Sequence, residues 1–171
     1  MAEDGTWPTV ERSLAGMDHP LLHAILDYWD ELRGTRAIPR RREIDPVLLP
    51  RPSLSHLFLM HVEGRYFRYD LVGTALELQF GMSMAGRLSE ELPFEPDRNS
   101  IFSQHQVTAE TQHPTYREHD LVDREKKLVH CCRLLLPLSA DGTTVTDLFG
   151  IWLFANRPPG GAGTAAGFAR R

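Results

Sequence analysis

The first sustained pattern of apolar and polar positions is helical and lies near the amino terminus. Asp18 is a suitable N-cap, and Pro20 falls in the first turn, where its missing N–H is harmless. Arg33 followed by Gly34 is a typical helix end. The apolar residues that recur on one face of this segment are Leu22, Ile25, Leu26, Trp29 and Leu32. This spacing predicts an amphipathic helix whose apolar face needs a partner.

Beyond residue 56 the pattern becomes that of strands and short helices. Five β-rich runs are expected to form strands, at residues 57–62, 66–72, 115–122, 127–138 and 144–154. Between the second and third runs the sequence indicates two helical segments, at 75–80 and 97–112. The last three runs are joined by connections of hairpin length, which favours an antiparallel meander. The element order predicts an α+β fold, a five-stranded antiparallel sheet with helices over one face and the amphipathic helix before it.

The chain has 171 residues, which fits one core with an extension at each end. We expect an N-terminal arm at residues 1–17, a single domain at 18–156 and a flexible Gly- and Pro-rich tail at 157–171. A net charge of −4 argues against a general nucleic-acid-binding protein, and no apolar run approaches the length of a membrane span. The acidic amino terminus is unlike a secretory signal, and two adjacent cysteines make no disulfide framework, so we expect a cytoplasmic protein.

Two segments of the chain carry a distinctive combination of residues. The first contains YWDELRG, RAIPR and IDP within residues 28–46. The second contains FRYDLVGT, FGM and Gly86 within residues 67–86. Together they resemble a proteobacterial family of small, stand-alone PAS-like domains, and the resemblance covers about residues 20–155. It implies a five-stranded antiparallel sheet that cups a small cavity, with helices across its mouth.

Domains of this family sense a small molecule, a cofactor or a partner, and transmit the change through the sheet to a dimer interface. The resemblance therefore implies a sensory or signalling domain that binds a small ligand or a protein partner and regulates through homodimer or partner contacts. We expect no enzymatic activity, because no nucleophile elbow, zinc-protease helix or phosphate-binding loop is found. Two alternatives stay open: a small cone-shaped α+β enzyme, and a structural adaptor without a ligand.

The expected ligand cavity lies on the concave face of the sheet and beneath the helices over it. The residues assigned to it are Tyr69, Phe80, Met82, Phe102, His105, Tyr116, His130, Leu134, Trp152 and Phe154. An apolar pocket with a few polar groups is typical of small-ligand sites, whereas the same residue types also make a filled core. The apolar face of the amphipathic helix is the candidate contact with a second copy or a signalling partner, the alternative being that it covers its own sheet.

The sequence leaves the cofactor open. His105 lies on the helix that carries the axial ligand in haem-binding PAS domains, while the alternative is a partly buried, hydrogen-bonded helix histidine. Ser100 and Ile101 replace the cysteine and arginine of the flavin-binding motif, which excludes a covalent flavin photocycle. The histidine spacing predicts no metal site. Cys131 and Cys132 are expected on one strand with opposite orientations, one packed inward and one facing out.

Overall fold

The structure, a computed structural model, describes residue 14 and residues 16–155 of the chain. The predicted tail and nearly all of the predicted arm lie outside the described residues. The helices of this part are α2 (Pro20–Arg33), α3 (Thr74–Phe80) and α4 (Arg98–Thr111). The 3₁₀ turns are η1 (Arg41–Glu43), η2 (Pro46–Leu48), η3 (Arg51–His56) and η4 (Ser89–Glu91). The strands are β1 (Leu57–Glu63), β2 (Tyr66–Val72), β3 (Thr115–Val122), β4 (Leu128–Ser139) and β5 (Val145–Ala155).

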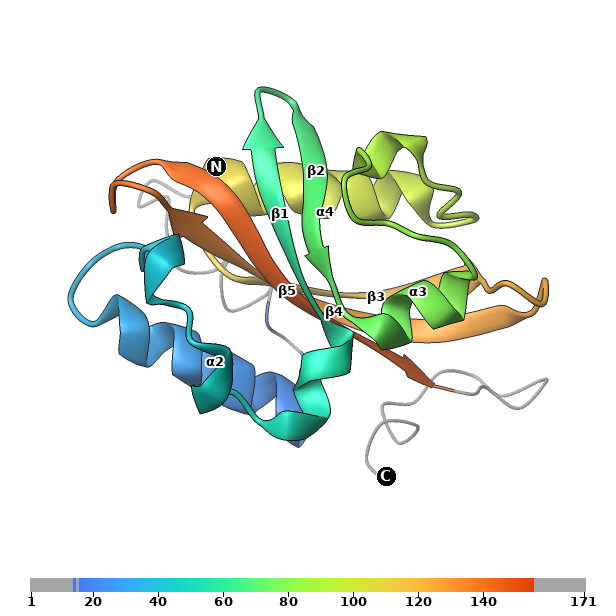
Figure 1. Cartoon of the computed structure of the whole chain (residues 1–171), viewed down its shortest axis with the longest axis horizontal. Helices are drawn as coiled ribbons and strands as arrows, with labels where there is room; N and C mark the ends of the chain where they lie inside the picture. The colour runs from blue at the N-terminus through green and yellow to red at the C-terminus, as the bar shows by residue number, and fades with distance from the viewer. Residues whose placement is uncertain (1–13, 15, 156–171) are drawn as a thin grey trace.

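The five strands form one antiparallel sheet in the order β2-β1-β5-β4-β3 (Figure 1). The hairpin β1–β2 and the meander β3–β4–β5 each pair along the chain, as the short connections predict. Pairing of β1 with β5 joins these two units and places Leu57 opposite Ile151. The predicted α+β fold is confirmed.

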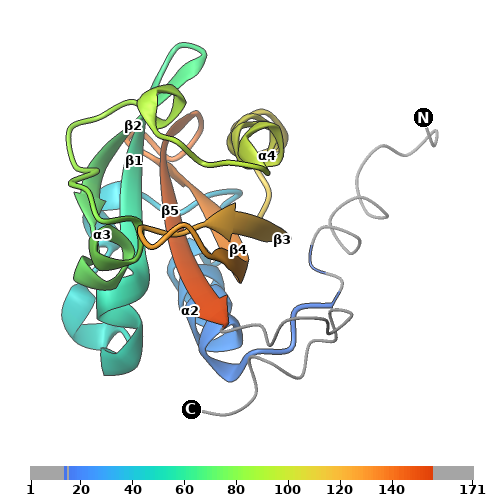
Figure 2. The ribbon, with the colours of Figure 1, turned by 90° about the vertical axis from the view of Figure 1, so that its right-hand side faces the viewer.

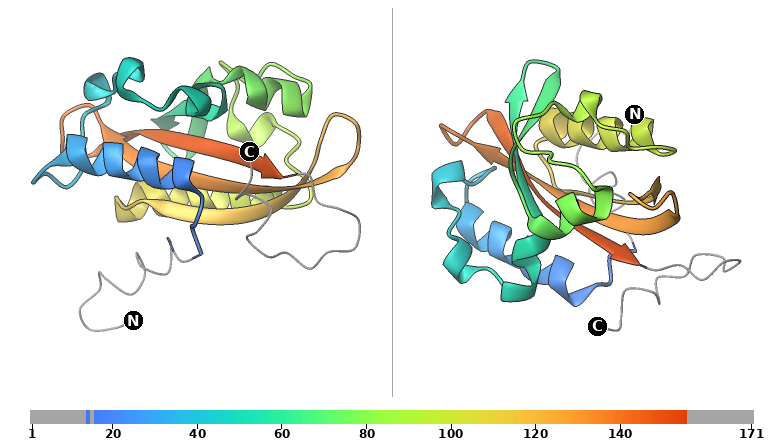
Figure 3. Two further views of the ribbon diagram at one scale, coloured as in Figure 1. Left: turned by 90° about the horizontal axis from the view of Figure 1, so that it is seen from below. Right: turned by 45° about the vertical axis from the view of Figure 1, so that its right-hand side comes forward.

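Helices cover both faces of this sheet. Figure 2 shows α4 above the curved sheet and α2 below it, and the left panel of Figure 3 shows β4 and β5 passing between them. We call the face that carries α4 the inner face and the face that carries α2 the outer face. Each face of the central strands is therefore buried, which explains the nearly continuous apolar run of β4.

Helix α2 begins one residue later than its sequence pattern suggests. His19 is the N-cap, because its Nδ1 accepts a hydrogen bond from Leu21 N at 3.1 Å. The expectation that Asp18 fills this position is thereby corrected. Gly34 ends the helix with a φ of 58°, a conformation that glycine adopts without the steric cost of a side chain.

The apolar face of α2 packs on the outer face of the sheet. Leu22 and Ile25 are fully buried. Trp29 Nε1 donates to the carbonyl of Pro137 on β4 at 2.8 Å, which satisfies the indole N–H in the interior. The helix therefore covers its own sheet, one of the two alternatives for its apolar face.

On the inner face the backbone of β5 approaches an aromatic ring. A Cβ at Gly150 would lie 2.2 Å from Phe58 Cζ, so only glycine fits here. The centroid of the Phe58 ring lies 5.7 Å from that of Tyr69 and 6.2 Å from that of Trp152. This close approach brings β1, β2 and β5 into one aromatic cluster.

The two cysteines point to opposite faces of β4, but both are buried. The expectation that one of them faces out is therefore corrected. Cys132 is covered because it packs near Tyr116 on the outer face, close enough for that hydroxyl to affect its pKa. Burial raises the pKa of Cys131 to about 12 and raises that of Cys132 as well, so both remain thiols at neutral pH.

Candidate ligand site

A single arginine occupies the middle of the inner face. Arg133 of β4 pairs with Arg117 of β3 and Trp152 of β5 in the strand register, and it is fully buried. Its guanidinium carbon lies 4.6 Å from the centroid of the Trp152 ring and 4.9 Å from that of Phe58. Cation–π contacts of this kind are strongest where water is excluded. The guanidinium is thus held against two aromatic rings in the core.

Helix α4 supplies the polar neighbours of this guanidinium. Gln104 Nε2 donates to the carbonyls of Thr115 and Arg133, both at 3.2 Å. These bonds orient the amide so that Gln104 Oε1 faces Arg133 Nη1 at 3.4 Å. His105 Nε2 lies 2.6 Å from Arg133 Nη2. Because a guanidinium can only donate, His105 Nε2 accepts and the imidazole carries its proton on Nδ1.

The two buried histidines of the cluster are neutral. Burial, reinforced by the charge of Arg133, holds the pKa of His105 well below its ordinary value. The same two causes lower the pKa of His119 to about 3, and its Nε2 lies 3.4 Å from Gln104 Oε1. Neither imidazole is charged at neutral pH. Arg133 is therefore the cationic member of this group.

Polar atoms without a hydrogen-bond partner among the described residues gather around Arg133. On the inner face they are Tyr69 Oη, Ser89 Oγ, His105 Nδ1, His119 Nδ1, Arg133 Nε and Trp152 Nε1. The Tyr69 hydroxyl is close enough to Ser89 and Arg133 for both to affect its pKa, which burial raises. Polar atoms in a protein interior are nearly always satisfied by protein, water or ligand. The inner face therefore offers donors and acceptors to a further molecule.

A cleft of about 390 Å³ opens next to this cluster, between α3 and the β3–β4 connection. Phe80 forms part of its wall, together with Met82. The Phe80 ring lies 5.2 Å from that of Trp152 and 5.3 Å from that of Phe94, while Phe94 and Trp152 are also 5.3 Å apart. Phe80 thus lies between the cleft and the indole that contacts Arg133.

Several residues predicted for the cavity come together on the inner face. Tyr69, His105 and Trp152 surround Arg133, and Phe80 packs on Trp152. Phe154 lies 5.7 Å from Phe80 between ring centroids. The half-buried residues Met82 and Phe102 lie at the rim, Met82 in the cleft and Phe102 6.4 Å from the His105 ring.

Three other residues predicted for the cavity, Tyr116, His130 and Leu134, are instead on the outer face. Side chains alternate along a strand, so the inward position of Arg133 turns Leu134 outward. Tyr116 pairs with Leu134, and His130 is three residues from Arg133. Tyr116 Oη donates to Glu118 at 2.8 Å, and His130 Nδ1 lies 2.9 Å from Asp120 Oδ1. Both contacts lie on the face opposite to the cluster around Arg133. Their placement is corrected by the strand register.

The residue at the centre of the cluster, Arg133, was not expected from the sequence, and neither were Gln104 and His119. A usable signal is present for Arg133, because it is the one charged residue in the run CCRLLLPL at 131–138. A charge within a strand that is apolar on both faces is rarely tolerated without a purpose. Gln104 and His119 have no comparable signal, since their partners lie far away in the sequence.

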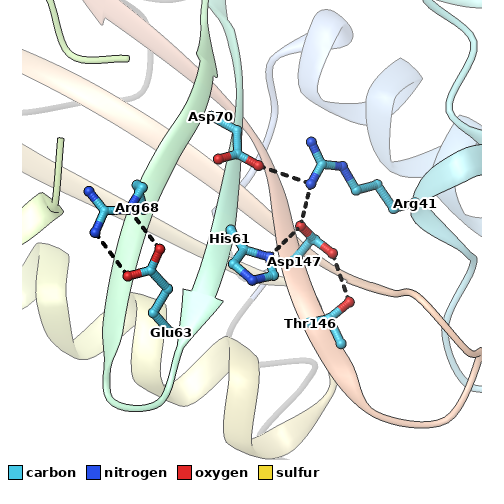
Figure 4. Close-up of polar contacts among 7 residues, drawn as sticks. All are labelled: Arg41, His61, Glu63, Arg68, Asp70, Thr146 and Asp147. Atoms are coloured by element: carbon cyan, nitrogen blue, oxygen red, sulfur yellow. Dashed lines mark hydrogen bonds and ion pairs between the residues drawn. The ribbon is translucent and has the colours of Figure 1, made fainter. Parts of the chain in front are cut away.

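A second polar cluster lies on the outer face near the β1–β2 hairpin (Figure 4). Arg41 of η1 bridges Asp147 of β5 at 2.7 Å and Asp70 of β2 at 2.9 Å. His61 Nδ1 of β1 lies 3.2 Å from Asp147 Oδ1, and the Asp147 side chain is nearly buried. Thr146 Oγ1 donates to Asp147 Oδ2 at 2.7 Å. Because both oxygens of the nearly buried Asp147 carboxylate have partners, this cluster fastens η1 to the sheet.

The residues predicted to form a partner-binding face on α2 divide into two groups. Leu22, Ile25 and Trp29 are buried against the sheet, whereas Leu26 and Leu32 are half-buried. Leu26 and Trp29 also line a cleft of about 450 Å³ that extends to residues 111–114 after α4. A contact with a partner through this helix stays a prediction.

His105 has the hydrogen bond that one of its two sequence interpretations describes, although its burial is complete rather than partial. A haem iron bound at His105 Nε2 would have to displace Arg133, which donates a hydrogen bond to this nitrogen. Within the described residues, no three His, Cys, Asp or Glu side chains converge as metal ligands. No helix in this part of the chain combines the length and the hydrophobicity that a membrane span requires.

Comparisons with known proteins agree with this architecture. The sequence matches the model of a family described as PAS domain over residues 17–153. No curated protein matches the chain.

Several solved structures have similar folds. A light-oxygen-voltage domain studied with a flavin analogue matches with a TM-score of 0.50 and 11% identity, over 62% of this chain and 81% of that chain. The light-oxygen-voltage domain of the blue-light-activated histidine kinase from Erythrobacter litoralis EL346 matches with a TM-score of 0.49 and 14% identity, over 60% of this chain and 96% of that chain. The PAS domain of BvgS from Bordetella pertussis matches with a TM-score of 0.41 and 15% identity, over 60% of this chain and 75% of that chain. At these identities the likeness concerns the fold alone.

Proposed function

Since the chain belongs to the PAS domain family, we propose that it is a sensory domain that binds a small ligand between the inner face of the sheet and the segments α3, η4 and α4. Binding changes the packing of the sheet, and the change is passed on through a homodimer or a signalling-protein partner. This function needs no catalytic step. We place it in the cytoplasm, since the only two cysteines are free thiols of high pKa.

One observation carries the proposal: the polar atoms without partners on the inner face. Tyr69 Oη and Ser89 Oγ are buried, come from β2 and η4, and lie near each other and near Arg133 without a well-formed hydrogen bond. A core that is only structural pairs such groups, because an unpaired one costs about 1–3 kcal/mol. A ligand with polar groups would satisfy both hydroxyls, which favours a binding site over a filled core.

A physical connection between ligand and output is available in β4. Arg133 faces the inner cluster, and the carbonyl of Pro137, four residues further along the same strand, accepts the hydrogen bond from Trp29 of α2. A shift of β4 caused by a ligand would therefore reach α2 directly. The cleft beside Leu26 and Trp29 is where we place the contact with a partner.

The alternative of a small enzyme finds less support in the same residues. A general base at neutral pH needs a pKa near 7 and reach to a substrate proton. The inner-face histidines have lowered pKa values, and Gln104 or Arg133 engages one nitrogen of each ring. This arrangement suits recognition better than proton transfer.

Native mass spectrometry of the purified protein, followed by a thermal-shift screen of small metabolites, tests the proposal. We expect a non-covalent mass that is lost on denaturation, or at least one metabolite that raises the melting temperature. Y69F should weaken that response, because the variant removes the core hydroxyl, whereas Y66F on the exposed side of the same strand should not. A tight dimer with no bound mass and no responding metabolite would support the structural adaptor instead.

A further inference from the structure

We propose that the inner-face site recognises an anion, a monocarboxylate carried on a small flat apolar body, and that Arg133 is its counter-charge. This inference rests on the proposed function and adds the chemistry of the ligand. Two observations carry it. Arg133 is buried and has no anionic partner within the described part of the chain, and the aromatic rings of Phe58 and Trp152 lie beside it.

The charge of Arg133 is not balanced locally. The residue is fully buried, and among the described residues Gln104 and His105, both neutral, accept from its terminal nitrogens, while the Tyr69 hydroxyl lies close to it. The largest electrostatic influences on its guanidinium come from Tyr69, Cys131 and Arg117, none of which is a carboxylate. A buried ion costs several kcal/mol unless an opposite charge and hydrogen bonds compensate for it. Proteins therefore rarely keep such a cation in a core without a use for it.

The nearest recorded acid does not fill this role. Glu90 of η4 affects the pKa of Tyr69 but is not among the groups that act on Arg133. Glu90 Oε2 is itself buried without a hydrogen-bond partner among the described residues. Arg117, on the neighbouring strand, donates to the Ser100 carbonyl at 2.9 Å and adds a second positive charge nearby. The balance of charge around the cluster therefore favours an incoming anion.

The donors of Arg133 match a carboxylate. A guanidinium has five N–H donors in a planar fork that fits two oxygens at once. Gln104 and His105 each accept from one terminal nitrogen, while Arg133 Nε has no acceptor. Tyr69 Oη and Ser89 Oγ lie close to each other and to Arg133 on the same side of the sheet, without a well-formed hydrogen bond, and can donate to a second oxygen. A bidentate carboxylate would engage these donors together.

The neighbouring walls indicate the rest of the molecule. Phe58 and Trp152 contact the guanidinium, and Phe80 and Phe94 pack on Trp152 toward the cleft of about 390 Å³. Rings of this kind bind flat apolar groups by stacking and edge contacts. Entry from the cleft needs a rotation of Phe80, since that side chain separates the cleft from Trp152. The size of the cleft limits the body to a small one.

Calorimetric titration with benzoate and with its neutral isostere benzamide tests the inference on the whole chain. We expect benzoate to bind at least about tenfold more tightly than benzamide, the preference that one charged hydrogen-bonded contact supplies. R133M, which keeps the length of the side chain and removes the charge, should abolish this preference. R51M is the matched control: it removes an exposed arginine of η3 and should keep the preference.

The outcomes separate this inference from the proposed function. Equal binding of benzoate and benzamide, or unchanged benzoate binding by R133M, would contradict the assignment of an anionic ligand. Either result would leave the proposal of a ligand site in the core intact. Binding of neither probe, when the metabolite screen identifies another ligand, likewise overturns the carboxylate assignment alone. Binding of neither probe with no responding metabolite overturns both.

A second measurement does not depend on the choice of probe. If Arg133 is kept for a ligand, ligand-free R133M should melt at the same temperature as the natural protein or higher, because a buried uncompensated charge has been removed. A melting temperature lowered by several degrees, with R51M unaffected, would mark Arg133 as a structural residue and contradict the inference.

Discussion

At the scale of single residues, the cluster around Arg133 combines one permanent charge with two histidines that stay neutral. Neutrality follows from position, because burial and the guanidinium both disfavour an imidazolium. In the unfolded chain these histidines titrate normally. The difference between the two states makes stability depend on pH in a predictable direction.

We predict that the protein loses stability as the pH falls below 6.5. The unfolded chain then binds a proton at His105 and at His119. The folded protein binds these protons only when the pH approaches the lowered pKa values of the two histidines. The unfolded state therefore binds more protons, and the slope of the free energy of unfolding should approach about 1.4 kcal/mol per pH unit for each histidine once the unfolded imidazole is almost fully protonated, about one pH unit below 6.5. Urea unfolding between pH 6.5 and 5 measures this slope.

The matched variants for this prediction are H119Q and H23Q. H119Q should remove about half of the slope, whereas H23Q, at an exposed position of α2, should keep all of it. A slope that H119Q leaves unchanged would mean that the His119 imidazole accepts a proton in the folded state.

The close approach at Gly150 gives a second prediction at this scale. In G150A the new methyl group would meet the Phe58 ring, so the ring or β5 must move. We expect a loss of about 1–3 kcal/mol in the free energy of unfolding, as overpacked cores show. Chemical denaturation measures it, with V47A at an exposed position as the control. Unchanged stability would show that the ring has free space beside it.

Some features at the residue scale could be predicted from the sequence and others could not. The sequence assigns Tyr69, His105 and Trp152 to the inner face, and all three surround Arg133 there. Tyr116 and Leu134 were placed on the wrong face, since neither face of β4 is polar and alternation cannot orient such a strand. The lone charge at Arg133 is the feature that would have set the correct orientation.

At the scale of elements, α2 is part of the core of this domain. Its buried residues and the indole hydrogen bond to Pro137 hold it on the outer face. Strand and helix ranges follow the sequence periodicity closely here, because each element has a clear period or a clear stop. The bulge between Leu59 and Met60 could not be predicted, and it leaves Leu71 exposed although Phe67 and Tyr69 are buried.

We predict that W29A destabilises the domain by about 3–5 kcal/mol, because it removes a buried aromatic side chain and leaves the Pro137 carbonyl without its donor. W29F should cost less, since it keeps most of the packing. Urea unfolding combined with gel filtration measures stability and assembly together, with E31A at an exposed position of the helix as the control. A stable W29A with a smaller assembly would instead indicate that Trp29 contacts a partner.

The two ion pairs in Figure 4 give a matched test of the link between η1 and the sheet. R41M should cost about 1–2 kcal/mol in the free energy of unfolding, because the nearly buried Asp147 carboxylate loses a charged donor. R68M breaks the exposed pair with Glu63 and should cost less stability than R41M. Equal effects of the two variants in denaturant titrations would contradict a structural role for the Arg41 bridge.

At the scale of the whole molecule, one curved sheet separates a polar aromatic cluster on its inner face from α2 on its outer face. Strand β4 contacts the elements on both faces: Arg133 bonds to His105 on the inner face, and the Pro137 carbonyl accepts from Trp29 of α2 on the outer face. We therefore propose that a ligand paired with Arg133 would bias the packing of α2 without any new contact to that helix. This shared strand is what makes the fold suitable for sensing.

The indole N–H resonances of the tryptophans test this account most directly. Trp152 reports on the inner cluster and Trp29 on the outer face, and substitution of each by phenylalanine assigns its signal. During a titration with benzoate we predict that the Trp152 signal shifts and saturates, that the Trp29 signal follows with the same midpoint, and that both responses vanish in R133M. A Trp152 signal that stays fixed while benzoate binds elsewhere would contradict a ligand site in the core.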